Sequence, residues 1–204
     1  MYAKRIGAEF FLITERKYPE WPILFERLQI YELAERRDDD WSIHIDSDTL
    51  VHPECIDFTE HLPRDMVAHN GSDFANIRFD YDRFFRRDGR NIGSCHWLGI
   101  ASSWCRELWK PPDDLTPEIA IAAIHPTVIE AAAGIMPEHL IDDYLISRNI
   151  ARFGLKFTTL IQLLDGLGIG NSNFFWHEYV ISEVEKVEHL AQRIKDWKLE
   201  GYLK

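Results

Sequence analysis

The chain has 204 residues, of which 46% are hydrophobic, so it is long enough for one domain with a buried core and short for two. Its 34 acidic and 23 basic residues give a formal net charge of −11, which argues against nucleic acid or an anionic membrane surface as a general partner. The three cysteines lack metal-type spacing, and the sequence contains neither a signal peptide nor an apolar run of membrane-spanning length. We therefore expect a single cytoplasmic α/β domain over residues 1–204, without a membrane span.

The first 40 residues predict a helix, a strand and a second helix. Residues 1–7 have the composition of a helix end, because Gly7 follows Lys4 and Arg5. Residues 8–14 are dense in aromatic and branched side chains, which predicts a strand. Apolar side chains recur at helical spacing over residues 22–37, which predicts a helix that covers a sheet.

The next stretch is an apolar run from Trp41 that breaks abruptly into Asp46-Ser47-Asp48. This pattern indicates a buried strand whose carboxyl end delivers two carboxylates to the edge where open α/β sheets bind ligands. The two carboxylates repel each other without a cation, but both can bind one divalent ion that also holds phosphate oxygens. A polar turn or a helix N-cap would use the same residue types.

The middle of the chain predicts short elements. Helices are expected at residues 54–61 and 102–109, and strands at 65–69 and 91–100. In the last strand small residues alternate with bulky ones. Gly93 and Gly99 therefore suit the close approach of a ligand or of another strand in a tightly packed buried sheet.

A second informative stretch lies at residues 137–157. Its apolar side chains follow a helical period that ends at Gly154, and residues 155–160 predict a strand. Asp142 and Asp143 fall in the early turns of this helix, where the helix dipole favours an ionised carboxylate. They either stabilise the helix or accept a proton, for which a base must lie within hydrogen-bond reach of its substrate.

The last stretch contains a short aromatic strand that ends in His177 and a helix at residues 181–203 with one apolar stripe. We expect the helix to pack on the sheet or on a partner chain, as in a homo-oligomer. His177 is either a metal ligand or a partly buried histidine bonded to the backbone.

Two of these stretches together resemble the GT-A glycosyltransferases. Asp46-Ser47-Asp48 resembles their Asp-x-Asp motif, and residues 137–157 resemble their Glu-Asp-x-x-Leu-x-x-Arg…Gly helix. The resemblance implies a GT-A-like, Rossmann-like fold with a mixed, mainly parallel sheet flanked by helices. In such enzymes a strand precedes the helix that Tyr2-Ala3-Lys4-Arg5 resembles, so we expect a fold without the usual first strand.

The resemblance also implies an activity: transfer of a sugar from a nucleotide-diphosphate sugar, with a UDP-sugar favoured, to a carbohydrate or other hydroxyl acceptor. Mn²⁺ or Mg²⁺ would assist the reaction. The site implied by the family comprises metal ligands Asp46, Asp48 and His177, donor-binding residues Asp46, Ser47, Asp48, Asn91 and Gly93, and Asp142 or Asp143 as the base of an inverting reaction. The alternatives are a retaining reaction without a base, a metal-dependent nucleotidyltransferase, and an inactive binding or assembly module of the same fold.

Overall fold

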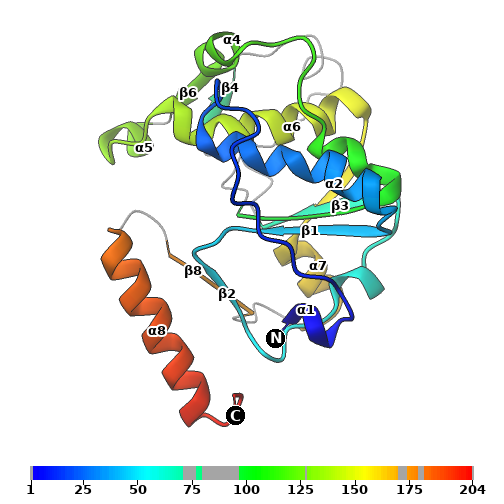
Figure 1. The fold of residues 1–204 in the computed structure, drawn as a ribbon, viewed down its shortest axis with the longest axis vertical. Helices are drawn as coiled ribbons and strands as arrows, with labels where there is room; N and C mark the ends of the chain where they lie inside the picture. Colours follow the sequence, from blue (N-terminus) through cyan, green and yellow to red (C-terminus); the bar gives the residue numbers. More distant parts are fainter. Residues whose placement is uncertain are drawn as a thin grey trace.

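The computed structural model describes residues 2–70, 77–79, 97–126, 128–169, 174–178 and 182–203. In these residues helices and strands form a mixed α/β fold (Figure 1). The strands are β1 (Trp41–Ile45), β2 (Thr49–Val51), β3 (Met66–His69), β4 (Ile77–Phe79), β5 (Leu98–Ser102), β6 (Ile124–Pro126), β7 (Lys156–Thr159) and β8 (Phe175–His177). The α-helices are α1 (Tyr2–Arg5), α2 (Ile30–Arg37), α4 (Pro117–Ala122), α5 (Val128–Ala132), α6 (Ile141–Phe153), α7 (Leu160–Gly166) and α8 (Glu183–Leu199). The 3₁₀ helices are η1 (Ile23–Gln29), η2 (Phe58–Glu60), η3 (Ser103–Trp109) and η4 (Pro137–Leu140).

The main sheet has four strands in the order β1-β5-β3-β7. β1 pairs antiparallel with β5, from Trp41 opposite Ser102 to Ile45 opposite Leu98. β3 is antiparallel to β5 and parallel to β7. The sheet is therefore mixed, as predicted, but parallel pairing does not predominate among its described pairings. Two small sheets, β2-β8 and β4-β6, lie outside it.

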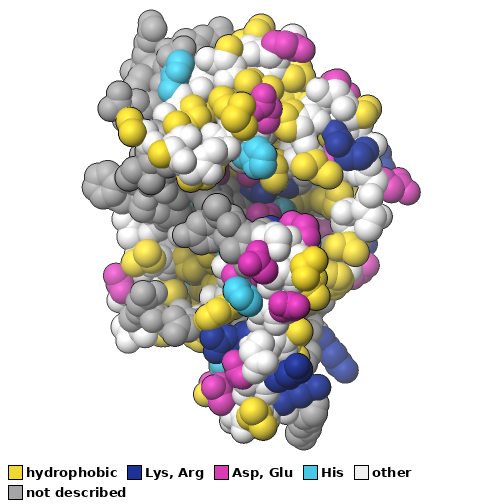
Figure 2. Space-filling model, turned by 90° about the vertical axis from the view of Figure 1, so that its left-hand side faces the viewer, with side chains coloured by type: hydrophobic (Ala, Val, Ile, Leu, Met, Phe, Trp, Pro, Cys, Tyr) yellow, Lys and Arg dark blue, Asp and Glu magenta, His cyan; other side chains and the backbone are white. Residues whose placement is uncertain are grey.

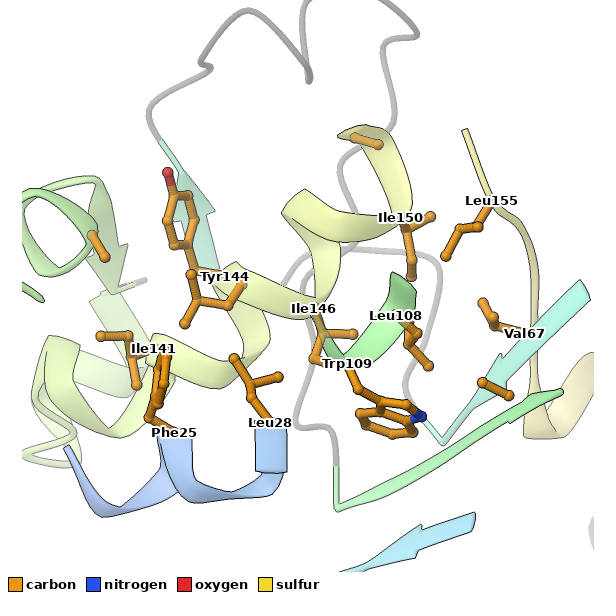
Figure 3. Packing of buried hydrophobic residues seen from close by; sticks show 14 of the residues in the cluster. Phe25, Leu28, Val67, Leu108, Trp109, Ile141, Tyr144, Ile146, Ile150 and Leu155 are labelled. Atoms are coloured by element: carbon orange, nitrogen blue, oxygen red, sulfur yellow. The ribbon is translucent and has the colours of Figure 1, made fainter. Parts of the chain in front are cut away.

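One face of the main sheet is covered by η1, α2, η3 and α6, which lie above the strands in Figure 1. Figure 3 shows Phe25 and Leu28 of η1 beside Ile141 of α6, and Trp109 of η3 over β5. Trp109 is also tied to β1, because its Nε1 donates a hydrogen bond to Ser42 Oγ at 2.9 Å. This packing fixes η1 and α6 relative to the carboxyl end of β1.

The opposite face packs on α7 and η2, which contribute Leu160, Leu164 and Phe58 to a second apolar cluster. Thr159 caps the start of α7, because its hydroxyl accepts a hydrogen bond from the Gln162 backbone N–H. Such caps satisfy the unpaired amides at the start of a helix. None of the helices in the described parts of the chain has the length and apolarity that crossing a membrane requires.

Most of the predicted elements are present. Gly7 and Gly154 have positive φ after α1 and α6, respectively, as expected of helix-ending glycines. The helix predicted at 22–37 begins as the 3₁₀ helix η1 and continues as α2. The strand predicted at residues 8–14 is wrong, because these residues form neither helix nor strand. Asn91 and Gly93 lie outside the described residues.

Candidate metal centre

The carboxyl end of β1 places two carboxylates in a tight turn. The Asp46 N–H donates to the Trp97 carbonyl at 2.9 Å, and the Thr49 N–H donates to the Asp46 carbonyl at 3.1 Å. The second bond closes a turn that sends the chain into β2. Ser47 lies between the two aspartates with an exposed side chain.

His177 reaches this turn through the small sheet. β2 pairs antiparallel with β8 so that Thr49 stands opposite His177, and the Glu178 N–H donates to the Asp48 carbonyl at 3.2 Å. His177 Nε2 is 3.3 Å from Asp48 Oδ1. One ligand atom each of Asp46, Asp48 and His177 lies within 4.8 Å of the others. The three residues predicted as metal ligands are therefore brought together.

A buried arginine, Arg27 of η1, joins this cluster to α6. Its Nη2 is 2.9 Å from Asp46 Oδ1, and its Nη1 is 2.7 Å from Asp142 Oδ2. Its side chain is 5% exposed. Sequence analysis missed Arg27, although a charged residue inside an apolar helical run that faces a sheet is a usable signal, because such a charge is buried only with a partner.

The two candidate bases, Asp142 and Asp143, lie in the first turn of α6 and are buried, with 4% and 3% of their surfaces exposed. Through Arg27, Asp142 belongs to the same charged network as Asp46. Asp143 occupies the next position in that turn and is buried to the same degree.

Burial dominates the electrostatics of the cluster. It raises the pKa of Asp46, a rise that Arg27 opposes and that Asp48 increases. It also raises the pKa of Asp142, where Arg27 opposes the rise and Asp46 adds to it. Burial lowers the pKa of His177, which Asp48 opposes, and a lowered pKa favours the neutral imidazole, the form that binds metals. Crowded, partly desolvated carboxylates beside a neutral imidazole favour a bound cation.

A second basic side chain, Lys186 of α8, also lies at the cluster. Its Nζ is 2.8 Å from Asp48 Oδ2 and 3.4 Å from Glu183 Oε1. The hydrogen bond to Asp48 raises the pKa of Lys186. Sequence analysis predicted only a packing role for the closing helix. Lys186 is therefore a second residue of the cluster that it missed.

The carboxyl end of β1 points to the left in Figure 1, and Figure 2 looks at the molecule from that side. A hollow lies near the centre of this face, with acidic, basic and histidine side chains visible inside it.

The donor set fits a divalent cation. Two carboxylates suit Mn²⁺ or Mg²⁺, and the imidazole favours Mn²⁺ of the two because Mg²⁺ strongly prefers oxygen ligands. No protein-family model matches the chain, and neither the curated proteins nor the solved structures that were searched contain a match. The chemistry of the site therefore has to be argued from its own residues.

Proposed function

We propose that the chain is a metal-dependent glycosyltransferase of the GT-A type, which moves a sugar from a nucleotide-diphosphate sugar to a hydroxyl acceptor. The observation that carries the proposal is the convergence of Asp46, Asp48 and His177 where β1 ends. Open α/β sheets bind nucleotides at the carboxyl ends of their strands. Divalent ions held by one or two carboxylates complete their coordination with substrate phosphates.

In this proposal Asp46 and Asp48 bind the metal through oxygen and His177 through Nε2. The ion, when bound, neutralises charge on the leaving diphosphate. Arg27 fixes the Asp46 carboxylate by a 2.9 Å ion pair and neutralises part of the negative charge of the centre. These contacts hold the ligands ready before a substrate arrives.

Asp142 is one candidate base, and Arg27 links its carboxylate to the metal centre. Burial raises the pKa of Asp142, and a carboxylate with a raised pKa accepts a proton from a hydroxyl more readily. In an inverting reaction Asp142, or Asp143 in the same turn, takes the acceptor proton. In a retaining reaction neither Asp142 nor Asp143 is required as a base.

Nucleotide binding tests the proposal and separates it from its rivals. We would titrate the protein with UDP, GDP and UTP, with and without Mn²⁺, by isothermal calorimetry. The variants are Asp48→Ala and, as a control, Asp39→Ala, which removes an exposed carboxylate paired with Arg37.

Diphosphate binding that needs both Mn²⁺ and Asp48, and that Asp39→Ala leaves unchanged, supports the glycosyltransferase. Tighter binding of UTP than of UDP favours a nucleotidyltransferase. No nucleotide binding under any condition overturns the proposal and favours an inactive module.

A further inference from the structure

The inference concerns Lys186 and rests on the proposed metal site. Each carboxylate oxygen of Asp48 already has a nitrogen atom close to it. Oδ1 is 3.3 Å from His177 Nε2, and Oδ2 is 2.8 Å from Lys186 Nζ. A divalent ion that binds Asp48 must share this carboxylate with the lysine or displace it. Two cations on one carboxylate repel each other at short range.

The two cations of the centre differ in how firmly they are held. Arg27 is 5% exposed and its two Nη atoms are fixed by separate buried or half-buried carboxylates, Asp46 and Asp142. Lys186 is 17% exposed at the end of a flexible stem. It also has a second carboxylate nearby, Glu183, whose side chain is 88% exposed and 3.4 Å away. Lys186 can therefore leave Asp48 without losing every partner, whereas Arg27 would lose its ion pairs with both Asp46 and Asp142.

We propose that Lys186 is a built-in cation that competes with the divalent metal for Asp48. Without metal it neutralises part of the charge of Asp48 and of the neighbouring Asp46. When the metal binds, the ammonium group moves from Asp48 toward Glu183 and solvent. Lys186 thereby lowers the affinity of the free protein for metal and makes α8, the helix that carries it, part of the site.

Mn²⁺ binding to the nucleotide-free protein tests this, measured by calorimetry and by the loss of the free-ion signal in electron paramagnetic resonance. Lys186→Met removes the competing charge, and Lys186→Arg retains it. Lys195→Met is the matched control, because Lys195 lies on the same helix with an exposed side chain. We expect Lys186→Met to tighten Mn²⁺ binding by about twofold to fivefold, in line with a partly exposed ion pair, and the other two variants to match the wild type.

Salt provides a second readout that a purely structural role of Lys186 would not change. The affinity gap between wild type and Lys186→Met should narrow as the ionic strength rises, because the competing ion pair is screened. Equal or weaker Mn²⁺ binding by Lys186→Met would overturn the inference and leave the metal site standing. Failure of both proteins to bind Mn²⁺ would overturn the metal site and the inference together.

Discussion

The two halves of the candidate metal centre are built very differently. Asp46, the core half, directly follows β1, an edge strand of the main sheet, and the buried Arg27 ties it to η1 and α6. Asp48 and His177, the outer half, adjoin a pair of three-residue strands, and the helix that contacts Asp48 has only Trp197 buried. The core half is attached to the main sheet and its covering helices, and the outer half to a two-stranded sheet and α8.

This difference indicates how a metal would act on the molecule. A ligand stabilises whichever state binds it, and here the ion would join the half attached to the main sheet to the half attached to the small sheet. The core half should therefore determine the stability of the metal-free protein, while the outer half should determine metal affinity. Each of the following predictions tests that separation.

The largest effect is expected for Arg27→Met. The substitution leaves Asp46 and Asp142 close together without their shared counter-charge, and breaking a buried ion pair by removing one partner costs about 3–5 kcal/mol. Urea unfolding followed by circular dichroism measures the loss. The control is Arg36→Met, which removes an exposed i,i+4 pair with Glu32 and should cost less than about 0.5 kcal/mol. Similar free energies of unfolding for the two variants would show that the buried ion pairs of Arg27 do not stabilise the fold.

A smaller effect is expected for Gly99→Ala in β5. A Cβ at Gly99 would lie 2.5 Å from Cη2 of Trp109, so the indole that covers β5 must shift. Overpacking of this kind costs about 1–3 kcal/mol. Gly166→Ala at the end of α7 meets no atom within 4 Å and should be neutral or stabilise by up to about 1 kcal/mol. Thermal unfolding of both variants checks the contrast, and a neutral Gly99→Ala would contradict the packing.

Glu26 provides a pH-dependent test of the core half. Burial opposes its ionisation, but hydrogen bonds from the Lys17 and Tyr18 amides and from Arg16 outweigh burial and lower its pKa below the usual 4.5. A lowered pKa means that the ionised form stabilises the fold above about pH 4.5, and that this contribution is lost as the pH falls through the folded-state value.

Glu26→Gln should therefore destabilise the protein by about 1–2 kcal/mol at pH 7 and by progressively less in acid. Urea unfolding of wild type and variant between pH 7 and pH 3 measures the difference. A difference that stays constant over this range would contradict the assignment of the stabilisation to the carboxylate.

The smallest effect on stability is expected for His177→Ala in the outer half. The residue lies in a short strand with partly exposed neighbours, so the metal-free protein should lose less than about 1 kcal/mol. Its affinity for Mn²⁺ should fall by about tenfold or more, because one ligand is removed. A large loss of stability with unchanged Mn²⁺ binding would reverse the roles of the two halves.

Local sequence patterns predicted the elements whose signals are local. The Trp41 strand, its acidic turn, the helix that ends at Gly154 and the final amphipathic helix all follow from periodicity and from glycine or aspartate at their ends. The prediction of a strand at residues 8–14 failed because a strand needs a hydrogen-bonded neighbouring strand, and composition does not show whether one is present. In the structure Phe10 and Phe11 are 76% and 56% exposed, outside the described sheets.

Part of the site was predictable because aspartate and histidine are residue types that bind metals. The convergence of Asp46, Asp48 and His177 agrees with the ligand set expected from the sequence. The burial of Arg27 had a signal in the sequence, but the partners of the two cations did not, because they are distant in sequence: Arg27 is 19 residues from Asp46, and Lys186 is 138 residues from Asp48. Arginine and lysine are also common on helix surfaces, so their residue types alone carry little information.

The most direct test of the central claim is an anomalous-scattering map from crystals grown with Mn²⁺ and UDP. The account predicts one Mn²⁺ peak bounded by Asp46, Asp48 and His177, with the diphosphate completing its coordination and Lys186 displaced from Asp48. A Mn²⁺ peak away from these three residues, or an ordered UDP that does not contact the ion, would contradict it.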